Sequence, residues 1–429
     1  MELKKYKLAD IAKIEISGVD KKTIEGETPV RLCNFVDVYY NWAITKEKAK
    51  SFMVASAKQT EIDKCSIGKG MVAITKDSET RDDIGVATYI ADDFEYVLLG
   101  YHCALITPNP AIVDGKYLNA FMHTRYIQKY VENNASGSGQ RYTLSNDTIS
   151  NIPVLLPSIE EQRTIGKVLA DIDCKIELNK LINDNLEAMA KQLYDYWFVQ
   201  FDFPNEEGKP YKSSGGTMVW NEKLKRKIPQ GWSNGILSDV ANITMGQSPD
   251  GSSYNEDGEG IIFYQGSTDF GLRFPDIRQY TTSPSRYANK GDILMSVRAP
   301  VGALNIANND CCIGRGLSAL SSKIGSMTHL YYLMNDFRLK FEGMNSAGTT
   351  FGSITKNELF SLPVIIPTKS VFSEFEQVCE PIFYKQMIIG EEINALTKQR
   401  DELLPLLMNG QASVNYHLSV LVSPSLYYI

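Results

Sequence analysis

The sequence predicts an α+β fold, in which two similar globular α/β units are separated by two long antiparallel coiled-coil helices with pseudo-two-fold symmetry. Three observations lead to this expectation: the length of 429 residues, a self-similarity between the two halves, and a heptad pattern that closes each half. A chain of this length with 43% hydrophobic residues is too large for one ordinary core. Two domains with connecting elements are therefore expected.

The self-similarity appears when residues 1–200 are laid against residues 231–408. The matched segments, in chain order, are residues 8–12 with 237–241, 35–37 with 267–269, 69–74 with 290–295, and 151–157 with 361–367. From the last pair onward the offset between the copies stays at 210 without a gap. Two ordered copies indicate a duplication rather than a solenoid.

Each copy ends in an apolar-leaning heptad sustained over about four repeats, which is typical of a coiled-coil seam. The positions are Ile165, Leu169, Ile172, Ile176, Asn179, Asn183, Leu186, Ala190, Leu193 and Trp197 in the first copy, and Phe375, Cys379, Ile382, Gln386, Ile389, Ile393, Leu396, Arg400, Leu403 and Leu407 in the second. Ser158 followed by Glu160 and Glu161 resembles a helix start. The alternative is two unrelated amphipathic helices, but these need not keep register with the segments before them.

Four seam positions are polar, and they have two interpretations. They are Asn179, Asn183, Gln386 and Arg400. Buried amides in an apolar seam cost stability but penalise slipped registers, so they can fix how two helices lie along each other. The alternative is a poorly packed or bent stretch that faces water.

These patterns give the domain boundaries. We expect globular units at residues 1–157 and 236–367, helices at 158–200 and 368–410, a linker at 201–235, and a tail at 411–429. The linker is predicted from its Pro, Gly, Ser and charged residues. Its basic run at 223–227 could touch phosphate, although such a run is more often a solvated loop.

Composition excludes several classes of protein. The seven cysteines form no Cys-x-x-Cys motif, so we expect reduced, buried thiols rather than disulfides or a zinc site. No apolar stretch approaches the ~20 residues that span a bilayer, and no apolar signal core opens the chain, so a cytoplasmic protein is expected. The net charge of −7 argues against a DNA binder that works by bulk electrostatics. Because the acidic excess lies mainly in the two helical segments, the globular parts can still present a local basic face.

Motifs for catalysis are absent from the sequence. Asn109-Pro110 lacks the second proline and the aromatic residue of an adenine-methyltransferase loop. The glycines at Gly246 and Gly251 have phosphate-loop spacing without the lysine. The four histidines, His102, His123, His329 and His417, have no metal-ligand spacing. We therefore expect a non-enzymatic chain with no cofactor or metal of its own.

Several motifs, taken in order, resemble the specificity (S) subunits of type I restriction-modification systems. They are Ile228-Pro229-Gln230-Gly231-Trp232, Met245-Gly246-Gln247-Ser248-Pro249, the runs at 291–298 and 347–351, Ile159-Glu160-Glu161-Gln162-Arg163, Tyr194-Asp195-Tyr196-Trp197-Phe198, and residues 403–410. The order of domain, helix, domain, helix makes the resemblance specific. The first copy departs from it by lacking the Ile-Pro-x-Gly-Trp opening, and residues 415–429 continue past the usual end.

The resemblance implies that each globular unit is a target recognition domain and that the helices are a spacer. It also implies double-stranded DNA, two methyltransferase (M) subunits and restriction (R) subunits as partners. The function expected is recognition of a bipartite, asymmetric DNA site by a non-catalytic subunit. The alternatives are a stand-alone methyltransferase or endonuclease with a divergent active site, and a coiled-coil scaffold without DNA contacts.

Base recognition in the major groove uses Arg, Lys, Asn, Gln and Thr on loops that reach the groove floor. The candidate DNA-binding residues are Asn34, Arg81, Gln140, Arg141 and Tyr142 in the first copy, and Gln265, Arg298, Arg315, Thr349 and Thr350 in the second. Arg298 and Arg315 lie beside small or turn-forming residues, where backbone can approach a ligand closely. Ordinary surface residues, or ion pairs within the domain, are the alternative for each candidate.

Overall fold

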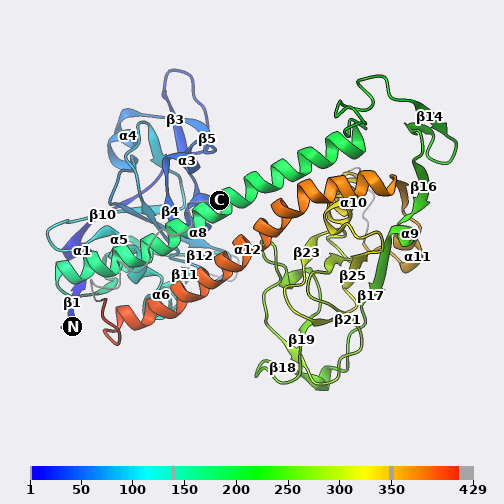
Figure 1. Cartoon of the computed structure of the whole chain (residues 1–429). Helices are drawn as coiled ribbons and strands as arrows, with labels where there is room; N and C mark the ends of the chain where they lie inside the picture. Colours follow the sequence, from blue (N-terminus) through cyan, green and yellow to red (C-terminus); the bar gives the residue numbers. More distant parts are fainter. Residues whose placement is uncertain (1, 138–140, 347–351, 415–429) are drawn as a thin grey trace. The chain divides into compact units, whose positions relative to one another are not determined.

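The computed structural model describes residues 2–137, 141–346 and 352–414 (Figure 1). The candidates Gln140, Thr349 and Thr350, together with His417 and the tail from residue 415, lie outside the described residues. The chain divides into two compact units, Met1–Leu178 with Asn394–Ile429 and Asn179–Ile393. Each unit therefore combines one globular head with a part of both long helices.

The head of the first unit is built around a mixed five-stranded sheet. Its order is β2 (Ala12–Ile16), β10 (Cys103–Pro108), β6 (Val72–Thr75), β8 (Ala87–Ile90) and β4 (Ala43–Ile44). Alternate residues of a strand point to opposite faces, and both faces are buried here. Val72 and Ile74 pack under helices α5 (Gly115–Met122) and α6 (Arg125–Asn134), whereas Ala73 packs on the opposite side.

Smaller elements complete this head. They are β1 (Lys4–Lys7), α1 (Leu8–Ile11), α2 (Phe35–Tyr39), α3 (Lys46–Ala49), α4 (Gln59–Cys65), β13 (Pro153–Leu156), α7 (Asn146–Ser150), the three-stranded sheet β5 (Met53–Ala57), β3 (Thr28–Cys33), β9 (Val97–Leu99), and the three-stranded sheet β11 (Ser136–Gly137), β12 (Tyr142–Thr143), β7 (Asp77–Ser78). β1 and β13 pair antiparallel and tie the start of the chain to the strand before the first long helix.

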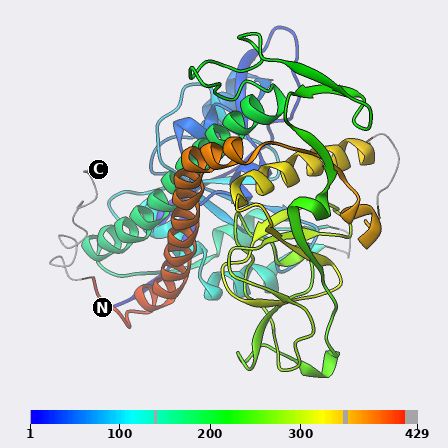
Figure 2. The same ribbon diagram turned by 45° about the vertical axis from the view of Figure 1, so that its right-hand side comes forward.

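The head of the second unit repeats this plan. Its sheet has the order β17 (Ala241–Met245), β25 (Leu317–Ser322), β22 (Ile293–Ser296) and β23 (Leu304–Ile306). Ile293 and Met295 pack with helix α10 (Met327–Ser346), and Leu294 packs on the opposite face. Figure 2 shows α10 beside the first turns of α12 (Lys369–Met408). The remaining elements are β16 (Ser233–Ile236), α9 (Leu237–Val240), α11 (Lys356–Phe360), β26 (Pro363–Ile366), and the sheet β18 (Tyr254–Asn255), β20 (Tyr280–Thr281), β19 (Ile261–Tyr264), β24 (Cys311–Ile313), β21 (Tyr287–Ala288).

The backbone confirms the duplication in detail. α7, β13 and the first long helix begin at residues 146, 153 and 159, and α11, β26 and the second long helix begin at 356, 363 and 369, so the offset of 210 is kept. The glycines of the matched segments 69–74 and 290–295 also correspond, because Gly70 has φ +92° and Gly291 has φ +93°. Such φ values favour glycine.

The two long helices are α8 (Ile159–Tyr194) and α12 (Lys369–Met408). Within the first unit Asp173 contacts Arg400, and within the second unit Trp197 packs on Phe375 with ring centroids 5.5 Å apart. Residue numbers thus rise along one helix as they fall along the other, so the pair is antiparallel, as predicted. A short π-helix, Asp195–Val199, continues from α8. The seam positions of both helices are buried or partly buried.

The segment predicted as a linker is packed rather than loose. It contains a hairpin of β14 (Met218–Asn221) and β15 (Arg226–Pro229). Phe201, Phe203 and Trp232 are buried in one cluster with Trp197 and Phe375. The sequence did not predict this packing, because the buried aromatic residues are widely spaced among Pro, Gly and Ser residues. Within the basic run, the Arg226 guanidinium carbon lies 4.9 Å from the Phe201 ring centroid.

Six of the seven cysteines are buried and free, as predicted, but Cys174 on α8 is exposed. The expectation of burial was wrong for Cys174 because it lies beside the seam rather than in it. Among the described residues, no helix combines the length and the hydrophobicity that a membrane span requires.

Candidate nucleic-acid interface

In the second head, the three described candidates lie on adjoining loops. Gln265 follows β19, Arg298 follows β22 and Arg315 precedes β25. The Val297 amide donates to the Gly316 carbonyl at 2.9 Å, which joins the Arg298 and Arg315 loops. All three side chains are exposed. The fold therefore gathers residues that are 50 positions apart in the sequence, from 265 to 315, at one edge of the head.

Glycines allow the Arg315 turn to pack closely against its neighbours. A Cβ atom on Gly314 would lie 3.0 Å from the Gln265 Cα, and one on Gly316 would lie 2.7 Å from the Gln265 carbonyl oxygen. A Cβ on Gly246 would lie only 2.2 Å from the Gly314 carbonyl oxygen. Gly246 is therefore required for packing and does not form a phosphate loop.

The Met-Gly-Gln-Ser-Pro motif supports the same turn. The Ser248 hydroxyl accepts a hydrogen bond from the Arg315 amide at 3.2 Å, and the Gln247 amide donates to the Ile313 carbonyl at 3.0 Å. The role of this motif could not be predicted from the sequence. Its effect is to fix the backbone of Arg315, so that the guanidinium is presented from a rigid turn.

No carboxylate among the described residues forms an ion pair with Arg298 or Arg315. This argues against the alternative in which each arginine bridges to an acidic residue of its own domain. Exposed guanidinium groups can donate two parallel hydrogen bonds to guanine O6 and N7. The second head thus carries the chemistry that guanine recognition needs.

In the first head, Arg81, Arg141 and Tyr142 lie together around Asp77. The Arg81 guanidinium carbon is 5.2 Å from the Tyr142 ring centroid, and Arg141 Nη2 is 3.4 Å from Asp77 Oδ2. β12, which holds Tyr142, pairs with β7, which holds Asp77. These three candidates therefore belong to one surface cluster, built by the short β11-β12-β7 sheet.

Asp77 and His102 hold this cluster together, and neither was predicted. His102 Nδ1 lies 2.6 Å from Asp77 Oδ2 and also contacts Arg141. Burial opposes ionisation of Asp77, but hydrogen bonds from Thr143 and His102 lower its pKa below the usual value. A buried acid that stabilises arginine and histidine orients the cluster, and a single sequence offers no signal for such a contact.

A hollow of about 520 Å³ borders the cluster. Its wall includes Tyr39, whose hydroxyl donates to Asp83 Oδ1 at 2.8 Å. This hydrogen bond raises the pKa of Tyr39 to about 12. The wall thus combines aromatic, acidic and basic side chains, in contrast to the exposed arginines of the second head.

Asn34 differs from the other described candidates because it is buried, with 6% of its surface exposed. Its main-chain nitrogen donates a hydrogen bond to Asp37 Oδ2 at 2.7 Å at the start of α2. Burial leaves its side chain no access to a groove. Its position therefore indicates a structural role, which the polar residue type alone did not reveal.

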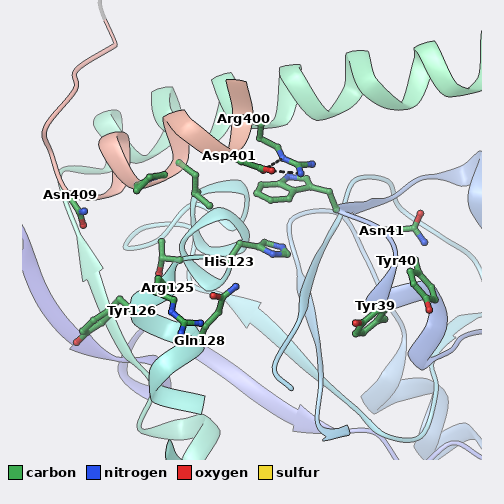
Figure 3. Close-up of a pocket in the computed structure, with 14 residues that line it drawn as sticks. Tyr39, Tyr40, Asn41, His123, Arg125, Tyr126, Gln128, Arg400, Asp401 and Asn409 are labelled. Carbon is green, nitrogen blue, oxygen red and sulfur yellow. Dashed lines mark hydrogen bonds and ion pairs between the residues drawn. The ribbon is translucent and has the colours of Figure 1, made fainter. Parts of the chain in front are cut away.

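A second hollow in the first unit, of about 650 Å³, lies between the head and the end of α12 (Figure 3). Trp42 stacks on His123 with centroids 4.3 Å apart, and the Arg400 guanidinium carbon lies 4.9 Å from the Trp42 ring. Figure 3 shows Arg400 joined to Asp401 on the helix. Arg400 also pairs with Asp173 of α8 at 3.4 Å. The polar seam residue Arg400 thus links both helices to the head.

Comparisons with known proteins agree with this architecture. The chain matches the family model of the type I restriction modification DNA specificity domain over residues 1–188 and 229–399. A putative type I restriction enzyme MjaX specificity subunit of Methanocaldococcus jannaschii is 30% identical over 377 residues, which cover 84% of this chain and 83% of the relative. The type I restriction enzyme HindI specificity subunit of Haemophilus influenzae is 23% identical over 399 residues, which cover 78% and 85%.

Among solved structures, the S subunit of a type I restriction-modification system from M. genitalium has a TM-score of 0.58 at 15% identity, over 95% of this chain and 96% of that chain. This likeness supports the fold, and the family match covers both heads and most of both helices. The chain therefore belongs to the type I restriction-modification DNA specificity family, as a DNA-recognition component rather than an enzyme.

Proposed function

We propose that this chain recognises a bipartite, asymmetric DNA site, with residues 1–157 and 236–367 as its two target recognition domains. The helical segments at 158–200 and 368–410 would serve as the spacer. The proposal assigns base contacts to Arg81, Arg141 and Tyr142 in the first domain and to Gln265, Arg298 and Arg315 in the second. No cofactor bound by the chain itself is needed for recognition.

One observation carries this proposal. The two heads share a backbone plan but present different side chains on their loops. Exposed arginines lie on the loops of the second head, and an aromatic, acidic and basic cluster lies on those of the first. Two identical recognition domains would favour a palindromic DNA site, whereas two different domains favour two different half-sites. Recognition of both halves by one chain leaves an unspecified gap between them.

The test is methylation-aware sequencing of a host that carries this gene with its methyltransferase gene. A gapped motif with different halves and one modified adenine on each strand is expected. A continuous or palindromic motif would contradict two independent heads. Methylation by the chain alone, with DNA and S-adenosylmethionine, would instead support the alternative of a divergent methyltransferase.

We also propose that two M subunits join one copy of this chain, and that R subunits complete the restriction complex in the cytoplasm. The long helices offer apolar docking positions, because Leu181 and Met189 on α8 and Tyr384 and Ile388 on α12 are exposed. Exposed apolar side chains mark a protein interface where they form a large contiguous patch. The family's partner subunits are the occupants we expect.

Sedimentation of the co-expressed proteins tests this assembly. The parent chain should co-migrate with two copies of its M subunit, and Tyr384→Asp or Met189→Asp should weaken the complex. Tyr96→Asp, at an exposed position of the first head, is the matched control. Co-migration that survives both helix substitutions would place the docking surface elsewhere.

A further inference from the structure

In both heads, the same pattern of backbone hydrogen bonds holds the loops at the edge where the candidate DNA-binding residues lie. Four bonds in the first head have counterparts in the second, and all eight N···O distances are 2.7–3.1 Å. They are Gly100 N to Cys33 O with Gly314 N to Tyr264 O, Ser17 N to Cys103 O with Gly246 N to Leu317 O, Lys76 N to His102 O with Val297 N to Gly316 O, and Leu144 N to Lys76 O with Ile354 N to Val297 O. The duplication thus extends to individual peptide groups.

This correspondence matches Tyr101 with Arg315. Gly100 and Gly314 are equivalent donors, and His102 and Gly316 are equivalent acceptors, so the residue between them occupies the same place in each head. A further contact agrees, because the Tyr101 amide donates to the Val19 carbonyl at 2.9 Å. The Arg315 amide donates to Ser248, and Val19 and Ser248 each lie two positions after the matched pair at 17 and 246.

The turn before Tyr101 packs as closely against its neighbours as the Arg315 turn does. A Cβ atom on Gly100 would lie 2.8 Å from Asn34 Oδ1 and 3.2 Å from the Cys33 carbonyl oxygen. Gly314 packs in the same way against Gln265. Asn34 and Gln265 therefore occupy equivalent backbone positions beside the two turns, although the Asn34 side chain is buried and the Gln265 side chain is exposed.

Tyr101 is accessible and borders the first head's surface cluster. Its exposed fraction is 46%, and its ring meets the His102 ring edge-on with centroids 4.1 Å apart. His102 contacts Arg141 and Asp77. An exposed aromatic ring, fixed on a tight turn beside an arginine cluster, has the placement of a recognition residue rather than of a core residue.

We propose that Tyr101 is a specificity-determining residue of the first head and contacts a base edge where Arg315 contacts one in the second. The proposal rests on the proposed function, because it presumes that both heads recognise DNA. A phenol cannot form the bidentate pair that arginine forms with guanine O6 and N7. The ring instead offers apolar contact, which suits the thymine methyl group. The first half-site should therefore contain an A·T pair where the second contains G·C.

The experiment is methylation-motif sequencing of the chain co-expressed with its M subunit, for the parent, Tyr101→Ala, Tyr101→Arg, Arg315→Ala and the control Tyr96→Ala. Tyr96 is 56% exposed and lies at the other end of β9 from Tyr101. Tyr101→Ala should relax one position of one half-site by roughly ten-fold or more and leave the other half intact. Tyr101→Arg should introduce a guanine preference at that position, and Tyr96→Ala should leave the motif unchanged.

An unchanged motif in Tyr101→Ala, with one half relaxed in Arg315→Ala, would overturn the assignment of Tyr101 and leave the proposed function intact. A parent chain without a gapped motif would instead overturn the proposed function. If Tyr101→Ala abolishes all methylation and lowers the melting temperature, the Tyr101→Arg variant distinguishes a base contact from a role in folding. Methylation with a new guanine preference supports a base contact, whereas no recovery assigns Tyr101 to the fold and rejects the proposal.

Discussion

Two buried histidines illustrate how single residues set the stability of the heads. Burial lowers the pKa of His123 to about 4, with the Arg400 charge as a second cause, and burial lowers the pKa of His329 to about 3. Both rings are neutral in the folded chain at pH 7. In the unfolded chain each titrates near its ordinary pKa, about 6.5. The unfolded state therefore binds more protons as the pH falls below that value.

The free energy of unfolding should consequently fall between pH 7 and pH 5, by about 2 kcal/mol for each of these histidines. His123→Phe and His329→Phe should each flatten this pH dependence. Denaturant unfolding at several pH values measures the effect. A variant whose stability falls with pH as steeply as that of the parent would show that its histidine is not the titrating group.

A buried arginine provides the second test at this scale. Arg273, with 5% of its side chain exposed, pairs with Glu187 of α8 at 2.7 Å, and Glu187 also accepts from Gln386 of α12 at 2.8 Å. Removing one partner of such a pair leaves a charge without compensation. Because the Glu187 side chain is 32% exposed, we expect a moderate loss in Arg273→Met, about 2 kcal/mol.

Thermal unfolding measures this loss, and Arg278→Met is the matched control. Arg278 is exposed and lies 3.9 Å from Asp276, so its replacement should change stability by less than about 0.5 kcal/mol. Equal effects of the two substitutions would argue against a stabilising role for the Arg273–Glu187 pair. A double variant, Arg273→Met with Glu187→Met, should recover part of the loss.

At the scale of elements, the contacts between the two long helices decide between the two interpretations of the polar seam residues. Asn179 donates to Glu392 at 2.9 Å and Gln386 donates to Glu187, so these amides join the two helices and do not face water. Asn183 is also buried, but its Oδ1 has no hydrogen-bond partner among the described residues. A buried acceptor without a partner costs free energy.

Asn183→Leu should therefore stabilise the chain by about 1 kcal/mol, whereas Asn179→Leu should destabilise it by a similar amount. Melting temperatures of the two variants provide the comparison, since both positions lie in the seam of α8 within the second unit. Destabilisation by Asn183→Leu would mean that this amide fixes the register of the helices despite its unsatisfied oxygen.

The same elements show what the sequence could predict. The heptads and the constant offset depend on local periodicity, so both long helices and the duplication were predictable. The strand orders were not, because β2 pairs with β10 across some 90 residues and no local pattern specifies that choice. The packing within the segment 201–235 could not be predicted, because Phe201 and Trp232 are separated by polar, turn-forming residues.

The candidate site shows the same limit. The exposure of Arg298 and Arg315 was predictable because arginine beside glycine or in a turn usually lies on the surface, whereas their contacts with DNA stay a prediction. Asn34 was a natural candidate by residue type, yet the turn at Gly100 covers it. Tyr101 could be found only from hydrogen bonds that match its turn with the Arg315 turn.

At the scale of the whole molecule, the chain crosses between its two compact units twice, once in each long helix. Each head therefore shares a core with its own parts of both helices. In the first unit, Leu404, Leu407 and Met408 of α12 are buried with Leu8 and Tyr117 of the head. Tyr101 and Arg315 lie in different units, whereas Arg298 and Arg315 lie in one unit on loops joined by a backbone hydrogen bond.

This organisation predicts where substitutions should be additive. The losses of DNA-binding free energy in Tyr101→Ala and Arg315→Ala should add within about 0.5 kcal/mol, because the two residues lie in different compact units. Arg298→Ala and Arg315→Ala should instead couple by about 0.5–3 kcal/mol, because loss of either side chain perturbs the same pair of loops. Titration of the M-subunit complex with a DNA duplex that carries both half-sites, at fixed salt, gives the two double-mutant cycles. Coupling across the two units as large as the coupling within the second head would show that the heads do not recognise their halves independently.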